Sequence, residues 1–157
     1  MVTAWRIVKR KHAKSAFSGE DARLFGGRWN SPGVPLIYTA ESQSLATLEM
    51  LVHLDAPELL EKYILFKVAI EASLVIDVDP AELPKNWKAR SSTSTCRALG
   101  DKWAGARVSV ALRVPSAIVL SEHNFLINPL HPDFSRLTIA QLPPYRFDSR
   151  LLKPRQG

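Results

Sequence analysis

The stretch that decides the fold is GGRWNSPGVPLIYTAESQSLATLE, which covers residues 26–49. Its glycine pair leaves no side chain between a ligand and the main chain, and glycine backbone can take conformations that other residues avoid. Further on, Ser31-Pro32-Gly33 has proline and glycine at the second and third positions of a type II turn. This turn predicts a tight return into a strand at 36–39, with Arg28 held on rigid backbone just before it.

Arg28 lies between the glycine pair and the turn. A guanidinium held in this way is suited to bidentate contact with a phosphate or a carboxylate, because its planar fork loses little freedom on binding. Arg28 and the backbone of Gly27 are therefore a candidate anion site. A surface arginine in a glycine-rich loop explains the same residues without a ligand, and the sequence leaves both interpretations open.

The most unusual residue of the stretch is Glu49, which stands inside the apolar run LATLEMLV at 45–52. A serine at position 42 or 44 can cap a helix that runs to about Leu54. With about 100° between residues, Glu49 lies about 60° from the centre of the buried face, and the opposite side is nearly as apolar. A buried carboxylate is costly unless it is paired. Glu49 is therefore either half of a structural ion pair, with Arg28 as the candidate partner, or a functional acid that faces a cleft.

Three further polar residues are candidates for the same site. Tyr38 shares a strand face with Leu36, so a place in the core explains it as simply as contact with a ligand. Ser116 follows a proline that breaks a strand, and its hydroxyl can either cap local backbone or touch a ligand. Asn128 stands before a proline in a loop that could fold over a pocket, although turn formation accounts for it equally well.

Outside residues 26–49, the pattern predicts short strands and helices in irregular alternation. Runs rich in β-branched and aromatic residues predict strands at 63–70, 74–78, 107–114 and 117–120. Helices are expected at 57–62 and over a segment that a serine within 91–94 caps and that ends by Gly105. The connections lack the regular helix spacing of a doubly wound fold. We therefore expect an α+β fold with a mostly antiparallel sheet, in one domain over residues 1–157.

The formal net charge of +6 favours an anionic partner, whether nucleic acid, an acidic protein or a phosphorylated small molecule. The basic residues gather at the two ends of the chain, at 6–14 and 146–155. No aromatic-interleaved RNA motif and no zinc-finger spacing accompanies them, so a solvated surface is the simpler interpretation. We expect no direct binding of nucleic acid.

Other features bear on location and cofactors. The sequence has no run of about 20 uncharged residues to cross a bilayer and no signal-peptide core after its basic N-terminus. The single Cys96 can form no internal disulfide, which suits a reducing compartment, so we expect a cytoplasmic protein that is not bound to a membrane. The four histidines show no ligand spacing, and neither a G-x-G-x-x-G nor a P-loop motif occurs. We expect no metal and no Rossmann or P-loop nucleotide site.

Taken together, these stretches resemble the RES domain family, the toxins of bacterial Xre-RES toxin–antitoxin pairs. The resemblance covers residues from about 5 to 134 and leaves the basic tail at 146–157 outside. It rests on six motifs in the order of the family: GGRWNSPG (26–33), YTAES (38–42), LATLEMLVHL (45–54), LGDKW (99–103), RVPSA (113–117) and INPLHPDF (127–134).

The resemblance implies an ADP-ribosyltransferase-like fold and a toxin that consumes NAD as its substrate, with no further cofactor. It identifies Arg28, Glu49 and Ser116 as the residues that give the family its name, places Tyr38 in the same pocket and assigns Asn128 to the INP segment. It also implies a helix-turn-helix antitoxin of the Xre type that occupies the active-site cleft, and so a hetero-oligomer.

These implied roles fit the chemistry of cleaving the nicotinamide N-glycosidic bond. Arg28 and the backbone of Gly27 would bind the diphosphate, Tyr38 would stack on the nicotinamide, and Asn128 would steady a neighbouring loop. Ser116 would hydrogen-bond the nicotinamide or its ribose, while Glu49 would stabilise the cationic ribose or orient the attacking water. One carboxylate is enough, since nicotinamide leaves as a neutral molecule.

Three alternatives remain at this stage. ADP-ribose could pass to a protein or to phosphate in place of water. The protein could instead be a basic nucleic-acid-binding or RNA-cleaving toxin, whose affinity would fall steeply with salt. It could also be a copy that binds a partner and has lost catalysis, although the intact set of Arg28, Tyr38 and Glu49 speaks against this.

Overall fold

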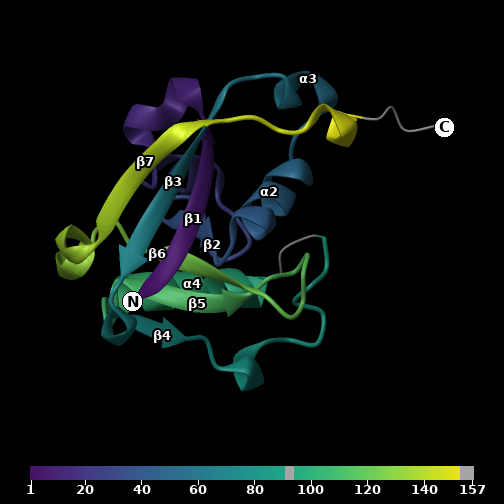
Figure 1. The fold of residues 1–157 in the computed structure, drawn as a ribbon. Helices are drawn as coiled ribbons and strands as arrows, with labels where there is room; N and C mark the ends of the chain where they lie inside the picture. Colours follow the sequence, from purple (N-terminus) through teal and green to yellow (C-terminus); the bar gives the residue numbers. More distant parts are fainter. Residues whose placement is uncertain (91–93, 153–157) are drawn as a thin grey trace.

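A computed structural model describes residues 1–90 and 94–152, and its centre is a seven-stranded sheet (Figure 1). The strands lie in the order β4-β5-β6-β2-β1-β3-β7. Neighbouring strands are antiparallel except for the pair β4 and β5. The prediction of an α+β fold with a mostly antiparallel sheet is confirmed. The strands are β1 (Val2–Lys9), β2 (Ile37–Ala40), β3 (Tyr63–Ile70), β4 (Val75–Asp77), β5 (Ala111–Pro115), β6 (His123–Ile127) and β7 (Thr138–Tyr145).

The helices are short apart from one. They are α1 (Glu20–Phe25), α2 (Gln43–Leu51), α3 (Ala56–Leu59) and α4 (Ser94–Ala106), with 3₁₀ turns η1 (Arg10–Ser15), η2 (Ala72–Leu74), η3 (Pro80–Glu82), η4 (Pro132–Arg136) and η5 (Ser149–Leu152). Ser42 caps α2, since its Oγ accepts a hydrogen bond of 3.0 Å from the amide of Leu45. Of the serines considered as caps for α4, the first two, at 91 and 92, lie outside the described residues.

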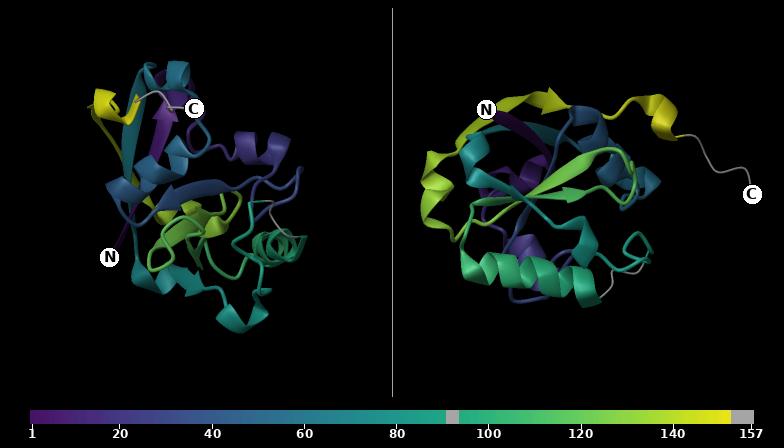
Figure 2. Two further views of the ribbon diagram at one scale, coloured as in Figure 1. Left: turned by 90° about the vertical axis from the view of Figure 1, so that its right-hand side faces the viewer. Right: turned by 90° about the horizontal axis from the view of Figure 1, so that it is seen from below.

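The sheet bends so that its two halves run in different directions. In Figure 1, β1, β3 and β7 run roughly upright, while β4, β5 and β6 cross below them. Helix α4 covers one face of the crossing half, as both views of Figure 2 show, and its Cys96, Trp103 and Ala104 pack with Leu112 and Leu126 of the sheet. Helix α2 lies beside β1 and β2. The region between α4 and α2, on one face of the sheet, is where the candidate site lies.

Two of the predicted strands are wrong in position. The segment at 117–120 forms no strand, because the amides of Ile118 and Val119 turn back onto the Oγ of Ser116, each at 3.1 Å. The next strand, β6, begins only at His123. The strand expected at 107–114 begins at Ala111, since Arg107 takes a left-handed backbone conformation with φ 52° after α4.

The sequence analysis also missed two strands, β1 and β7. Strand β1 pairs with β3 along its whole length, from Val2 opposite Ile70 to Lys9 opposite Tyr63. Strand β7 contains Pro143 and Pro144, which argue against a strand in most settings. They are tolerated here because β7 is an edge strand.

Helix α4 approaches the loop at 26–33 more closely than any side chain would allow. A Cβ built on Gly100 would lie 1.7 Å from the carbonyl oxygen of Trp29. The other glycine of α4, Gly105, has no atom within 4 Å of such a Cβ. The LGDKW motif therefore contains a glycine because the loop backbone rests directly on the helix.

These two glycines predict opposite effects of the same substitution. Gly100→Ala should lower the free energy of unfolding by about 1–3 kcal/mol or more, because the helix and the loop must separate. Gly105→Ala should raise it by up to about 1 kcal/mol through helix propensity, so it serves as the matched control. Urea unfolding followed by tryptophan fluorescence measures both values. Equal effects of the two substitutions would contradict the close packing.

Candidate functional site

The loop at 26–33 is built around the buried amide of Asn30. Its Nδ2 donates to the carbonyls of Ala22 at 2.8 Å, Val34 at 3.0 Å and Ser31 at 3.2 Å. The predicted turn is present, since Gly33 has φ 102° and the amide of Val34 donates to Ser31 O at 3.2 Å. Asn30 has no exposed surface, so every atom of this amide is used to fix the loop.

Tyr38 supports the loop from β2. Its hydroxyl donates to Asn30 Oδ1 at 2.6 Å and accepts from the amide of Trp29 at 3.1 Å. A Cβ at Gly27 would lie 2.6 Å from this hydroxyl, which explains the glycine at that position. Burial raises the pKa of the Tyr38 phenol above its ordinary value, so the hydroxyl stays protonated and able to donate.

Arg28 projects from this loop toward the segment that precedes α4. Its Nη1 donates to the carbonyls of Trp87 at 2.6 Å and Ala89 at 3.0 Å. Its Nε and Nη2 donate to no described residue. The ion pair with Glu49 that the sequence left open is absent from the described residues. Among the described residues, the guanidinium is therefore held on one side only, by Nη1, and Nε and Nη2 remain available to an anion.

Helix α4 and strand β1 supply further anchors that the sequence analysis did not single out. Asp101 Oδ1 accepts from the amide of Ser31 at 2.9 Å, and Arg97 Nε donates to Gly27 O at 3.4 Å. Arg6 donates to Ala16 O at 2.7 Å and to Tyr38 O at 2.9 Å, and burial lowers its pKa to about 10. A charged residue in the apolar strand β1 was a signal that could have identified Arg6.

Glu49 lies half-buried on α2 and is held by two neutral groups. Its Oε1 accepts from the Oγ of Ser116 at 3.0 Å and from the Nδ2 of Asn124 at 2.8 Å. Its Oε2 accepts from no described residue, and no described cation lies within 4.0 Å of the carboxylate. Among the described residues, the Glu49 carboxylate therefore has no counter-ion, and one of its oxygens is fixed by two donors while the other accepts no hydrogen bond.

Ser116 is fully buried at the end of β5. Its hydroxyl donates to Glu49 and accepts from the amides of Ile118 and Val119. The sequence offered two roles for Ser116, capping of local backbone and contact with a ligand. In the structure, its oxygen caps the local turn and also donates to the Glu49 carboxylate.

The two groups of residues lie on the same face of the sheet. Tyr38 pairs with Leu126 and Ala40 pairs with Asn124, and side chains two residues apart on a strand point to the same side. Tyr38 and Asn124 are therefore diagonal neighbours on adjacent strands, which are typically about 7–8 Å apart. The arrangement brings an arginine loop and an unpaired carboxylate to one surface.

Asn128 is not part of this surface group. Its Nδ2 donates to Ala104 O at 3.0 Å, and its Oδ1 accepts from the amide of Leu130 at 2.9 Å. It lines a cavity of about 210 Å³ together with Gly33, Asp101 and Arg107, among others. Its predicted part in binding a ligand stays a prediction.

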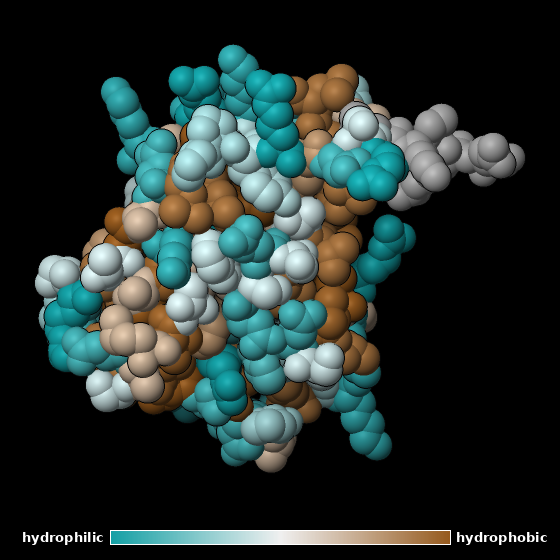
Figure 3. Space-filling view, viewed as in Figure 1, coloured by the Kyte–Doolittle hydropathy of each residue, from teal (hydrophilic) through white to brown (hydrophobic). Residues whose placement is uncertain are grey.

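The surface around Glu49 is apolar. Leu48 and Val52 on α2 are 40% and 59% exposed, and Ile118 and Leu120 after Ser116 are 36% and 56% exposed. Figure 3 shows hydrophobic side chains gathered along the side of the molecule on which α2 lies. Exposed apolar side chains grouped in this way are typical of a surface that another molecule covers.

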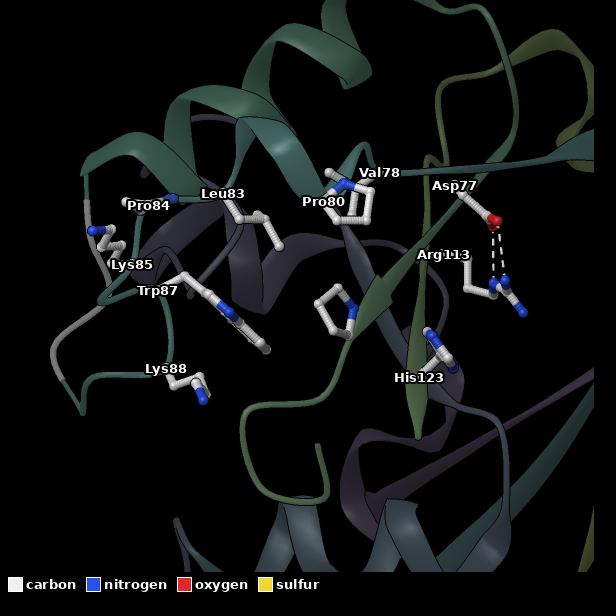
Figure 4. A pocket seen from close by; sticks show the side chains of 11 residues that line it. Asp77, Val78, Pro80, Leu83, Pro84, Lys85, Trp87, Lys88, Arg113 and His123 are labelled. Carbon is white, nitrogen blue, oxygen red and sulfur yellow. Dashed lines mark hydrogen bonds and ion pairs between the residues drawn. The ribbon is translucent and has the colours of Figure 1, made fainter. Parts of the chain in front are cut away.

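A cavity of about 560 Å³ lies next to the candidate site (Figure 4). Trp87 and Lys88 lie on one side of it, and Arg113 and His123 on the other. Arg113 is tied to Asp77 by hydrogen bonds of 2.8 Å and 3.0 Å. Neither Glu49 nor Arg28 lines the cavity. Two of its lining residues, Pro115 and His123, directly precede Ser116 and Asn124 in the sequence. A third, Trp87, accepts a hydrogen bond from Arg28 through its carbonyl.

Within residues 1–90 and 94–152, no cluster of three or more His, Cys, Asp or Glu residues is arranged to hold a metal ion. None of the helices in the described part of the chain combines the length and the apolar character needed to cross a membrane.

The family model of the RES domain matches residues 3–148. The chain belongs to the RES domain family. Among its relatives, Toxin Res of Yersinia enterocolitica is 38% identical over 148 residues, which are 94% of this chain and 97% of the relative. Toxin Res of Photorhabdus laumondii is 38% identical over 154 residues, 97% of this chain and 98% of the relative. The Prs ADP-ribosylating toxin of a Sphingobium species is 33% identical over 154 residues, 95% and 96% of the two chains.

Among solved structures, the MbcT–MbcA toxin–antitoxin complex of M. tuberculosis contains a chain with the same fold. The TM-score is 0.75 at 23% identity, over 96% of this chain and 86% of that chain. The expected fold of the RES domain is thereby confirmed.

The buried phenol of Tyr38 predicts how the stability of this RES domain depends on pH. Its folded pKa is raised, so its contribution is complete below the unfolded value of about 10 and is lost as the pH rises above it. Tyr38→Phe should be less stable than the parent by about 1–3 kcal/mol at neutral pH, because Asn30 and Trp29 lose a partner. The difference should shrink between about pH 9 and about pH 11. Urea unfolding across this pH range measures the difference in the free energy of unfolding. A difference that stays the same at every pH would show that the pKa of Tyr38 is not raised in the folded protein.

Proposed function

We propose that this protein is the toxin of a toxin–antitoxin pair and that it cleaves the bond between nicotinamide and ribose in NAD, with water as the acceptor. The observation that carries the proposal is the state of Glu49. Its carboxylate has two neutral donors on one oxygen and no described cation beside it. A preorganised negative charge of this kind stabilises the cationic ribose that develops as nicotinamide leaves.

Arg28 supplies the complementary charge. Its Nη1 is tied to backbone carbonyls, which orients the guanidinium, and its remaining donors can bind the diphosphate of NAD. The backbone of Gly27 lies beside it without a side chain, and the partly buried ring of Tyr38 would stack on the nicotinamide. Ser116, which has no exposed surface, contributes by holding Glu49.

The names of the relatives support the role as a toxin, and one of them also supports the use of NAD. Two relatives are called Toxin Res, and a third is called an ADP-ribosylating toxin. That third name favours a second candidate function, in which ADP-ribose passes to a protein acceptor on the same site. Both functions consume NAD, require Glu49 and place the action in the cytoplasm.

We infer that an antitoxin with a helix-turn-helix domain of the Xre type is the partner. The support is the apolar surface beside Glu49, formed by Leu48, Val52, Ile118 and Leu120. A partner that covers these side chains also covers the carboxylate. The structure with a similar fold was determined as a toxin–antitoxin complex.

Glu49→Gln should slow NAD cleavage, with a loss of about 100-fold or more in kcat. The amide oxygen of glutamine can still accept from Ser116 and Asn124, so the fold should be unchanged. Incubation of the purified protein with NAD, followed by mass spectrometry, measures nicotinamide and distinguishes ADP-ribose, its phosphorylated form and a modified protein. Glu61→Gln, on the surface near Lys9, is the control. A Glu49→Gln variant as active and as toxic as the parent would disprove the proposal.

Arg28→Lys should raise KM for NAD by about 10- to 100-fold, with a smaller change in kcat. The reason is that a lysine keeps the charge but lacks the fork that can bind backbone and phosphate together, and a lost charged hydrogen bond is worth about 1.5–3 kcal/mol. Initial rates over a range of NAD concentrations give both constants. Arg136→Lys, in an exposed ion pair with Glu71, is the matched control. An unchanged KM would remove Arg28 from the diphosphate site.

A further inference from the structure

Asn124 is a residue that neither the motifs nor the composition singled out. It lies on β6, between Ala40 of β2 and Val114 of β5, and its side chain reaches α2 across the face of the sheet. Its Nδ2 donates to Glu49 Oε1 at 2.8 Å, the shorter of the two hydrogen bonds to that oxygen.

The other half of this amide is left without a partner. Among residues 1–90 and 94–152, Asn124 Oδ1 is the one buried side-chain polar atom that makes no hydrogen bond. A buried acceptor without a donor costs free energy. Turning the amide over would not help, because it would direct a carbonyl oxygen at the carboxylate oxygen of Glu49, and neither atom can donate.

The orientation of the Asn124 amide therefore provides a donor to Glu49, although it leaves the Asn124 oxygen without a hydrogen bond. Asparagine is suited to this task because it donates a hydrogen bond without carrying a charge. A lysine or arginine in its place would form an ion pair and neutralise the carboxylate, which would then favour a cationic ribose less.

We propose that Asn124 is a positioning residue for Glu49, an inference that rests on the proposed function. Together with Ser116, it fixes Oε1 of Glu49 in one rotamer and leaves Oε2 as the oxygen that acts on the reacting ribose. Holding a charged group in its productive geometry before the substrate binds raises kcat, because the group need not be reoriented during the reaction.

The test compares Asn124→Leu with the parent. Leucine has nearly the same shape, and it removes both the donor and the unpartnered acceptor. The melting temperature should be unchanged or higher, kcat for NAD cleavage should fall about tenfold or more, and KM should change by less than about threefold. A purely structural hydrogen bond would give the reverse pattern, with lower stability and unchanged kcat per folded molecule, and would overturn the proposal.

A second variant separates the loss of the donor from any effect of leucine. Asn124→Ala also removes the donor, and it does so without placing the branched leucine side chain beside Glu49. Its kcat should fall at neutral pH as that of Asn124→Leu does, because the lost donor is common to both. If either variant folds and keeps kcat within about twofold of the parent, the proposal is wrong.

The inference also predicts how the substitutions combine. Because Asn124 acts through Glu49, adding Asn124→Leu to Glu49→Gln should slow cleavage no further. An equal loss in both backgrounds would show that Asn124 acts independently of Glu49, and would contradict the proposal.

A crystal structure of Asn124→Leu gives a readout that does not depend on activity. The Glu49 carboxylate should occupy more than one rotamer there, and a single unchanged rotamer would overturn the inference. A parent protein that leaves NAD intact would contradict the proposed function, whereas the rotamer comparison would still decide the role of Asn124. Cleavage that is lost in Glu49→Gln but kept in Asn124→Leu would contradict only the inference.

Discussion

The structure depends on a carboxylate that is held without being neutralised. Glu49 receives hydrogen bonds from a hydroxyl and an amide, and no described cation shares its environment. For an ordinary buried carboxylate, a cation would be the more stabilising neighbour. The protein instead uses neutral donors, one from the turn after β5 and one from β6, on the face of the sheet where Tyr38 also lies.

The arginine loop is constrained in the complementary way. Asn30 and Tyr38 satisfy the polar groups beneath it, and Gly100 lets the backbone of α4 support it directly. Arg28 therefore presents its guanidinium from backbone that has little freedom left. Two opposite charges on one face, not paired with each other among the described residues, suit the proposed substrate, which has a diphosphate and a reacting sugar that becomes cationic.

Residues with local signals were the predictable part of this molecule. The strand at 63–70 and the cap at Ser42 follow from propensity and from capping chemistry, and both agree with the structure. Glu49 stood out because its apolar setting made a carboxylate unexpected. The strand proposed at 117–120 was wrong because apolar alternation there competes with the Ser116 hydroxyl, which draws the following amides into a turn. Strand β7 contains two prolines and depends on its pairing with β3, and Asn124 is identified only by its contact with α2, so neither of them has a local signature. Strand β1 has the β-branched and aromatic composition of a strand, which the sequence analysis did not use.

In the carboxylate site, Glu49 on α2 is separated along the chain from its two donors by 67 residues for Ser116, after β5, and by 75 for Asn124, on β6. During synthesis, Glu49 leaves the ribosome long before either of its donors has been added. The nascent chain consequently carries no assembled carboxylate site until residue 124 has emerged and β6 has paired with β2. Fragments released by termination before residue 124 lack the site for the same reason, so only chains that extend beyond β6 can possess it.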